Sequence, residues 1–288
     1  MNNKVITLGY HDGMSFCALE NTAPTSMYIA DVDKLVLIVT NRFLLASESM
    51  LVSYLFDTLR LQGMNENDLA AKIHRMVKSN YLTAYRFSDS ENDNLLTVYG
   101  LGYRGRGYLK SIGETPRMTG YLAQLDAYSA LKILAANQLL IHKRAAFHSF
   151  HVCKTILAQN KDIEKTHLIV RPQGMLQTAE GTQLLETVRR APDYLEKLRE
   201  KLSRMQLLLD REDLNMEVSA PSLTLICEDN AMLEEVRQLV SEKRYFFSIS
   251  AVTDTQIENN ADVQEMQLTA ATEKSFLERL RNRLFYAA

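Results

Sequence analysis

The sequence has no long apolar run and few cysteines. None of its hydrophobic stretches approaches the roughly 18 residues that span a bilayer. The N-terminus, MNNKVITLGYHDG, lacks the basic start and apolar stretch of a signal peptide. The three cysteines (Cys17, Cys153 and Cys227) are scattered and odd in number, so they predict no disulfide framework. We therefore expect a soluble, cytoplasmic protein that has no membrane partner.

The chain also has little net charge. Its 33 Lys and Arg against 35 Asp and Glu give −2, which is no general reason to expect nucleic-acid binding. The charge is uneven, however. Residues 1–165 contain 18 basic and 15 acidic side chains, whereas residues 166–288 contain 15 and 20. This asymmetry hints at a division of labour between two halves, and 288 residues suit roughly two domains.

The first domain is predicted over residues 31–117, after an irregular segment at 1–30. Apolar spacing predicts helices over 32–45, 47–60 and 65–77, then strands over 81–87 and 95–102 around a polar tip at 88–94, and a short helix over 103–113. Three helices followed by a hairpin are the layout of a winged helix-turn-helix, whose third helix commonly lies in the major groove.

The third helix and the hairpin supply the candidate DNA-binding residues. A helix fills the major groove, and Lys and Arg neutralise phosphates. The candidates are Asn67, Lys72, Arg75 and Lys78 on the helix, with Arg86, Arg104 and Arg106 supporting it on the DNA backbone. The alternative is a solvated or protein-docking surface, because residues 42–117 hold only 10 basic against 8 acidic side chains.

The rest of the chain is predicted to be a helical connection followed by an α/β domain. Residues 118–165 are apolar and basic, and we expect them to be helical. The second domain, 166–288, has strand-like runs at 166–172, 222–229 and 244–254, a strand or helix start at 183–188, and helices at 192–212, 230–243 and 273–286. Strand, helix and strand in succession predict a parallel pair. The whole chain is expected to be α+β, and its last helix to be a packing or dimer element.

The layout resembles the replication-relaxation proteins of plasmids and conjugative elements. The resemblance is carried by TVYGLGYRGRGYL at 97–109, IVRPQGML at 169–176, LLETVRR at 184–190, KLREKLSRM at 197–205 and SLTLICEDNAMLEEV at 222–236. It covers about residues 31–255 as a pattern without a sharp motif. It implies a winged helix followed by a domain that looks like the restriction-endonuclease fold.

The nuclease-like comparison also implies which catalytic residues should be present. Active enzymes of that fold place an Asp after a Pro, and then a Glu or Asp, one residue and a Lys, for metal-assisted phosphodiester chemistry. Here Gln173 follows Pro172, Glu186 matches the second acid, and Val188 stands at the lysine position. Gln is a poor Mg²⁺ ligand and Val is none. We therefore expect no catalytic residue, although a Mg²⁺-dependent nuclease stays a third, disfavoured class.

Other motifs fall short of a site. His148, His151 and Cys153, with His142 before them, lack the further ligands that zinc needs. The glycine-rich run at 100–107 lacks the GK[ST] ending of a phosphate loop, and no G-x-S-x-G is present. We expect no metal and no cofactor.

These patterns predict a DNA-binding accessory or regulatory protein of a mobile genetic element, acting in replication, transfer or transcription control. Its expected partner is double-stranded DNA, with a homodimer or a protein partner possible. The alternative function is a protein-interaction scaffold that uses the winged helix as its docking module.

Overall fold

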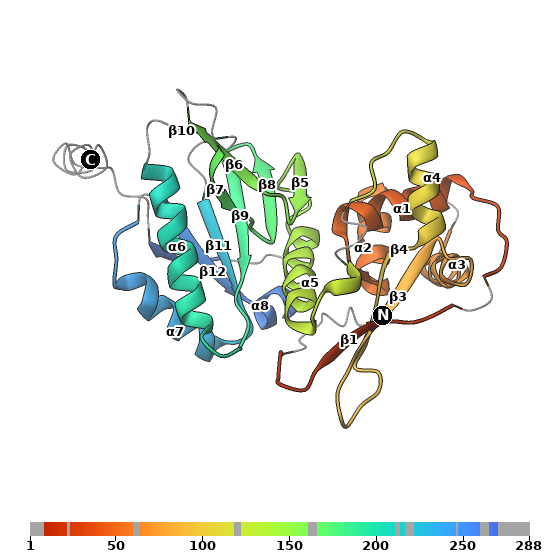
Figure 1. The fold of residues 1–288 in the computed structure, drawn as a ribbon, viewed down its shortest axis with the longest axis horizontal. Helices are drawn as coiled ribbons and strands as arrows, with labels where there is room; N and C mark the ends of the chain where they lie inside the picture. Colours follow the sequence, from red (N-terminus) through yellow and green to blue (C-terminus); the bar gives the residue numbers. More distant parts are fainter. Residues whose placement is uncertain are drawn as a thin grey trace.

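The computed structural model describes residues 9–21, 24–59, 64–117, 122–160, 166–210, 214–216, 222–245, 247–259 and 265–269. Over these residues the protein is α+β, with a four-stranded, a three-stranded and a six-stranded sheet (Figure 1). Helices α1 to α4 and the six-stranded sheet lie on opposite sides of helix α5 (Figure 1). In this part of the chain, no helix is both long and apolar enough to cross a membrane.

The four helices and the hairpin of the N-terminal part follow the predicted order, and two short strands, β1 and β2, were not predicted. In chain order the elements are β1 (Ser15–Ala18), α1 (Asp31–Phe43), β2 (Ala46–Ser47), α2 (Glu48–Leu59), α3 (Glu66–Lys78), β3 (Leu82–Ser88), β4 (Leu96–Leu101) and α4 (Tyr103–Ser111). The sheet has the order β1-β3-β4-β2 and is antiparallel throughout. The segment expected to be irregular therefore contains a strand, because residues 15–18 pair with the outer edge of β3.

Local chemistry explains where α3 begins. The side chain of Asn65 accepts a hydrogen bond from the Asp68 backbone N–H at 2.9 Å, and Asp68 accepts one from the Asn65 backbone N–H. This capping box satisfies two N–H groups that have no partner inside the helix. Leu69, Ile73 and Met76 are buried at helical spacing, which fixes the rotation of α3 about its axis.

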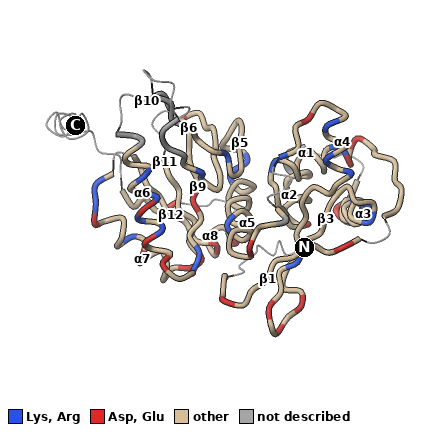
Figure 2. The backbone as a smooth tube through the Cα atoms, in the orientation of Figure 1, with Lys and Arg blue, Asp and Glu red and all other residues tan. Residues whose placement is uncertain are grey.

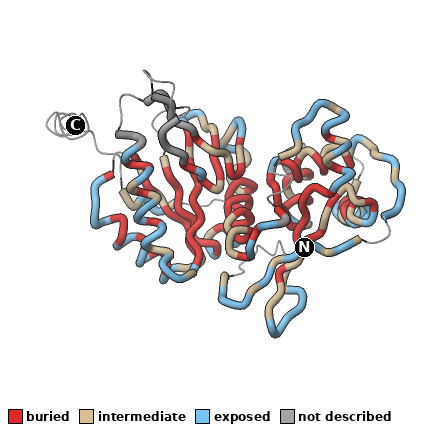
Figure 3. The backbone as a smooth tube through the Cα atoms, viewed as in Figure 1, coloured by how far each residue is buried: buried red, intermediate tan, exposed pale blue. Residues whose placement is uncertain are grey.

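Helix α5 (Ala127–His142) joins the two sides of the molecule. It is buried along most of its length (Figure 3), and its side chains belong to a core that reaches both the N-terminal helices and the six-stranded sheet. Inside this core the amide of Asn137 donates to the carbonyls of Phe43 and Leu45, at 2.9 and 2.6 Å. These bonds tie α5 to the connection between α1 and β2.

The expectation of a helical segment over 118–165 is wrong beyond α5. Strands β5 (Ser149–Val152) and β6 (Ile156–Asn160) follow the helix. Strand β5 pairs with β8 (Gly174–Thr178), and β6 pairs with β7 (Thr166–Val170) and β10 (Leu214–Met216). Pairing with strands that come later in the chain overrides the local helical pattern, as is common for β-structure.

The six-stranded sheet has the order β13-β12-β11-β9-β8-β5. Its central strands β9 (Gly181–Thr187), β11 (Ser222–Cys227) and β12 (Ile249–Thr253) are parallel, which confirms the predicted parallel pair. The run 183–188, left open between strand and helix, is a strand. The edge strand β13 (Met266–Thr269) and strand β8 are antiparallel to their neighbours, and the sequence reading missed both strands.

The sheet is covered on both faces, and its central strands place apolar side chains on each of them. Leu185 and Ile226 belong to the core shared with α5, whereas Leu184 and Leu225 belong to the second core. Helices α6 (Tyr194–Asp210) and α7 (Asn230–Ser241) supply that second core, and α8 (Asp254–Asn259) follows β12. The predicted helix at 273–286 lies outside the described residues.

Candidate functional site

The outer face of α3 gathers three of the predicted DNA-binding residues. Asn67, Arg75 and Lys78 are exposed, on the side of the helix opposite the buried stripe that contains Ile73. Ala71, whose side chain is small, lies between them on the same face. Within the described residues, neither Arg75 nor Lys78 has a side-chain hydrogen bond or ion pair. This face therefore presents one amide and two cations that form no ion pair within the described residues.

Lys72 is placed differently from its three neighbours. Its ammonium contacts the carboxylate of Asp33 on α1 at 3.2 Å, and the Asp33 side chain is only 2% exposed. Position 72 lies at the boundary between the exposed and buried faces of α3, so its side chain reaches inward and gives the buried Asp33 carboxylate a counter-charge. Lys72 therefore links α3 to α1 and does not belong to the exposed group on α3.

Two of the three predicted arginines outside α3 bond to backbone carbonyls of the fold. The guanidinium of Arg104 donates to the carbonyl of Thr25 at 2.8 Å, and that of Arg106 donates to the carbonyl of Leu101 at 2.9 Å. Arg86 lies on β3, and its buried Nε has no partner in the described part of the chain. None of the three joins the exposed face of α3, although Arg104 stays exposed on α4.

The hairpin tip between β3 and β4 is acidic. Asp89, Glu91 and Asp93 lie within seven residues there, and Figure 2 shows their negative charge at the end of the hairpin. Two backbone N–H groups, from Glu91 and Asn92, hold the pKa of the Asp89 carboxyl below its ordinary value. Since phosphates repel these carboxylates, the tip is a poor contact for a DNA backbone.

A second charged group surrounds Glu186, which lies on β9 with its side chain 5% exposed. Lys132 from α5 contacts one carboxylate oxygen at 3.1 Å, and Lys201 from α6 contacts the other. The side-chain amide of Gln173 also faces this carboxylate, and with its nitrogen turned toward Glu186 it donates to the two oxygens at 2.6 and 2.8 Å. Lys201 donates further to the carbonyl of Arg171 at 3.0 Å. We call Gln173, Glu186, Lys132 and Lys201 the Glu186 cluster.

The pKa values of the two lysines in the Glu186 cluster are shifted in opposite directions. Burial lowers the pKa of Lys132, but the Glu186 carboxylate more than compensates and the net shift is upward. For Lys201 burial outweighs the same carboxylate, and the pKa is lowered. One buried carboxylate thus faces two half-buried cations, which makes the cluster positive overall.

The donor chemistry of the Glu186 cluster does not fit a divalent cation. Mg²⁺ is bound through oxygen atoms, whereas Gln173 turns its N–H groups to Glu186 and both carboxylate oxygens already face ammonium groups. Val188, at the expected lysine position, is buried in the second core. Lys201 brings an ammonium to Glu186 from the following helix instead.

Sequence reasoning missed both lysines of this cluster. Lys132 and Glu186 lie 54 positions apart and on elements that pack together only in the folded chain. The position of Lys201 gave a weak indication that its side chain turns inward. It stands three residues after Leu198 and four before Met205, which are both buried on α6. A lysine beside an apolar stripe often reaches along it to a buried partner.

The remaining sequence motifs stay apart or serve packing. His151 lies on β5 between two buried neighbours that point to the other face, and His148 is exposed before the strand. Cys153 is buried, and burial raises the pKa of its thiol. In the glycine-rich run, a Cβ on Gly105 would lie 2.1 Å from the carbonyl oxygen of Tyr81, so α4 packs there by its backbone.

Comparisons with known proteins add little to this geometry. No family model matches the sequence, and no curated protein matches it. A distant structural likeness exists to the crystal structure of protein VC1899 from Vibrio cholerae, with 11% sequence identity and a TM-score of 0.30. The match covers 86% of this chain and 56% of that chain, so this chain spans about half the length of its neighbour. At that TM-score the likeness carries no functional argument.

Proposed function

We propose that this protein is a DNA-binding accessory protein whose N-terminal elements act as a winged helix-turn-helix. The order of three helices and a hairpin supports this reading, with α3 as the recognition helix and β3 and β4 as the wing. Its exposed Asn67, Arg75 and Lys78 are the observation that carries the proposal. Asn and Arg are the side chains that pair bidentately with adenine and guanine in the major groove.

The charge distribution sets the strength of this binding. Only two cations on α3 are uncommitted, and the acidic tip of the hairpin opposes phosphate contact. Because each phosphate contact contributes about −0.9 to the slope of log K against log salt, we expect a slope of about −2 for one chain. Binding by a single chain is therefore weak, and a dimer that joins two such helices would strengthen it.

The test is a salt titration of binding to labelled duplex DNA, followed by fluorescence anisotropy. The double variant Arg75→Ala with Lys78→Ala should bind more weakly and flatten the salt dependence. The matched control is Lys243→Ala with Arg244→Ala, which removes the same charge from an exposed site after α7. Equal binding by both double variants, or no binding at low salt, would refute the proposal.

The C-terminal region is proposed to be a restriction-endonuclease-like domain without catalysis. The neutral Gln173 and the two ammonium groups that face Glu186 support this, because they leave no oxygen ligands free for a metal ion. Incubation with supercoiled plasmid and Mg²⁺ should produce no nicks. Cleavage that disappears in a Glu186→Ala variant that still unfolds cooperatively would restore the nuclease interpretation.

A protein-docking scaffold is the second candidate, and the acidic hairpin tip favours it. Asp89, Glu91 and Asp93 would attract a basic partner as strongly as they repel DNA. Either function would suit a protein of a mobile genetic element, acting in replication, transfer or transcription control. We base this proposed setting on the resemblance to replication-relaxation proteins.

A further inference from the structure

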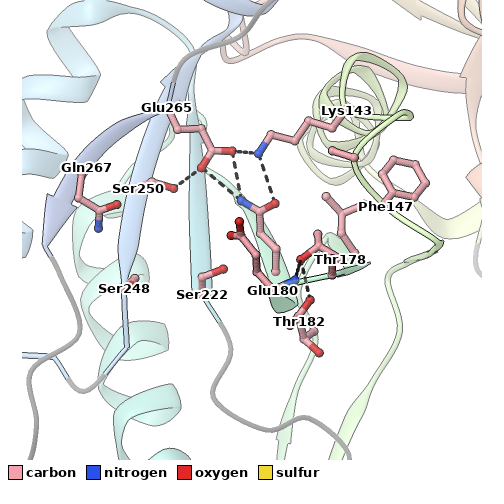
Figure 4. A pocket seen from close by; sticks show the side chains of 15 residues that line it. Lys143, Phe147, Thr178, Glu180, Thr182, Ser222, Ser248, Ser250, Glu265 and Gln267 are labelled. Carbon is pink, nitrogen blue, oxygen red and sulfur yellow. Dashed lines mark hydrogen bonds and ion pairs between the residues drawn. The ribbon is translucent and has the colours of Figure 1, made fainter.

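A cavity of about 600 Å³ lies on the α5 face of the six-stranded sheet, beyond the C-terminal end of α5 (Figure 4). Its walls come from residues 143–147, which directly follow α5, from strands β8, β9, β11, β12 and β13, and from residues next to these strands. The cavity is separate from the Glu186 cluster, none of whose residues lines it. Its size is in the range of small-molecule sites.

The base of the cavity is a pre-built polar network around Glu265. The carboxylate of Glu265 accepts from Thr224 at 2.9 Å and from Gln183 at 3.2 Å, and it also contacts Ser250 and Lys143. Burial raises the pKa of Glu265, but Lys143 and the hydroxyl donors more than compensate and lower it. The network is satisfied internally, so these side chains are held in place before any ligand arrives.

Free hydrogen-bonding groups line the cavity beside this network. The hydroxyl groups of Ser222 and Ser248 are half-buried and have no side-chain partner in the described residues. Figure 4 places both below Ser250, with Thr182 and Glu180 across the cavity. Half-buried hydroxyls without protein partners are suited to bonds with a ligand or with water.

One wall of the cavity is apolar. Phe147 lies beside Lys143 in Figure 4, and Leu176 and Ala146 complete this part of the lining. The Phe147 ring is held edge-on against Phe150, with ring centroids 5.7 Å apart. An aromatic ring opposite a row of hydroxyl groups can contact the flat, apolar face of a ring while polar groups bond to its edge.

The charge of the lining excludes one ligand class. Lys143 is the only cation of the lining and is already paired with Glu265, whereas Glu180 adds an exposed carboxylate at the edge. The lining is therefore negative overall, and a phosphate or another anion would be repelled. The ligand that fits is neutral, carries several hydroxyl groups and has one apolar face.

We propose that this cavity binds a sugar ring with vicinal hydroxyl groups, stacked on Phe147 and hydrogen-bonded to Ser222 and Ser248. Such a ring can come from a ribonucleoside or from a free oligosaccharide. This binding site is independent of the α3 face, so it stands whether or not the protein binds DNA.

The experiment is a titration of the full chain with adenosine, 2′-deoxyadenosine and maltose, followed by saturation-transfer NMR and calorimetry. We expect saturable binding of adenosine or maltose with a dissociation constant below about 1 mM. Weaker binding of the deoxy compound than of adenosine identifies a ribonucleoside site, and binding of maltose alone identifies a carbohydrate site. No saturable binding of any of the three overturns the proposal.

Two variants tie the binding to this cavity. Ser222→Val with Ser248→Val removes both hydroxyl groups without touching the Glu265 network, and Phe147→Leu removes the ring. Each should weaken binding at least about tenfold while the thermal unfolding profile stays cooperative. Ser241→Val is the control, because within the described residues its hydroxyl bonds to the Gln238 carbonyl on α7 and does not line the cavity. Unchanged binding in the cavity variants would place the ligand elsewhere and refute the assignment.

Discussion

The ammonium of Lys201 on α6 contacts the carboxylate of Glu186 on β9, fifteen positions earlier in the chain. Lys132 on α5 contacts the same carboxylate from the preceding helix. One buried acid on β9 therefore links α5 to α6, whose apolar side chains belong to different cores. This arrangement makes Glu186 a structural centre of the C-terminal region, and it leads to a stability prediction.

Replacing Glu186 with glutamine should destabilise the protein. The variant keeps the shape of the side chain but leaves two ammonium groups, on side chains 17% and 25% exposed, without a counter-charge. Breaking a fully buried pair costs about 3–5 kcal/mol, and we expect a smaller loss here because water reaches both lysines. Urea unfolding followed by circular dichroism measures the loss. Glu196→Gln on α6 is the control, because its pair with Arg199 is exposed and should matter little. Equal midpoints for the two variants would contradict a structural role for Glu186.

Two glycines of α4 should respond in opposite directions to alanine. At Gly105 an added Cβ would meet the Tyr81 carbonyl at 2.1 Å, so Gly105→Ala should cost about 1–3 kcal/mol through displaced backbone. At Gly107 a Cβ meets nothing within 4 Å, and Gly107→Ala should stabilise the helix by up to about 1 kcal/mol. Thermal unfolding of both variants checks the sign. Similar melting temperatures would show that α4 does not pack on residue 81 in this way.

Asp254 should give the stability a pH dependence of unusual sign. Burial raises the pKa of Asp254 from 3.8 to about 6, against the opposing effect of Arg189, which contacts it at 2.9 Å. The folded state therefore holds this proton more tightly than the unfolded state. Its contribution to stability is full below about pH 4 and is lost as the pH rises through about 6, a change of about 3 kcal/mol.

The measurement compares unfolding free energies of the wild type and of Asp254→Asn between pH 4 and pH 7. The difference between the two proteins should shift against the wild type as the pH rises, because only the wild type must ionise a buried carboxyl. A difference that is constant across this range would mean that Asp254 titrates near its ordinary pKa.

Most of the helical fold could be predicted from sequence, and the reason lies in particular stripes. Leu69, Ile73 and Met76 repeat at helical spacing and are buried on α3, so local periodicity locates the helix. Residues 149–152 carry no comparable signal, since their conformation depends on pairing with β8. The parallel strands β11 and β12 were predictable because a helix of fitting length separates them.

The candidate sites were less predictable, for a different reason. Charge and spacing place Arg75 and Lys78 on an outer face, but they cannot show that Lys72 turns inward to Asp33, which lies on another helix. Likewise Val188 in the sequence indicates a missing lysine, whereas the fold supplies Lys201 to the same carboxylate. Side-chain partners far apart in the chain depend on packing that no local pattern contains.

Neutralising the hairpin tip distinguishes the two proposed functions. The triple variant Asp89→Asn, Glu91→Gln and Asp93→Asn removes three carboxylates that a DNA backbone repels and keeps the shapes of the side chains. If α3 binds DNA, the affinity for duplex DNA should rise by about 3- to 10-fold at low salt. The gain should shrink at higher salt, because salt screens the charges. Anisotropy titrations at two salt concentrations measure it.

The control for this variant removes the same charge far from the hairpin. Glu196→Gln, Glu200→Gln and Glu234→Gln neutralise three exposed carboxylates on α6 and α7. A gain in the tip variant that exceeds the gain in this control locates the DNA beside the hairpin. Equal gains would reflect net charge alone, and a tip variant that binds DNA no better but loses a basic protein partner would favour the scaffold function.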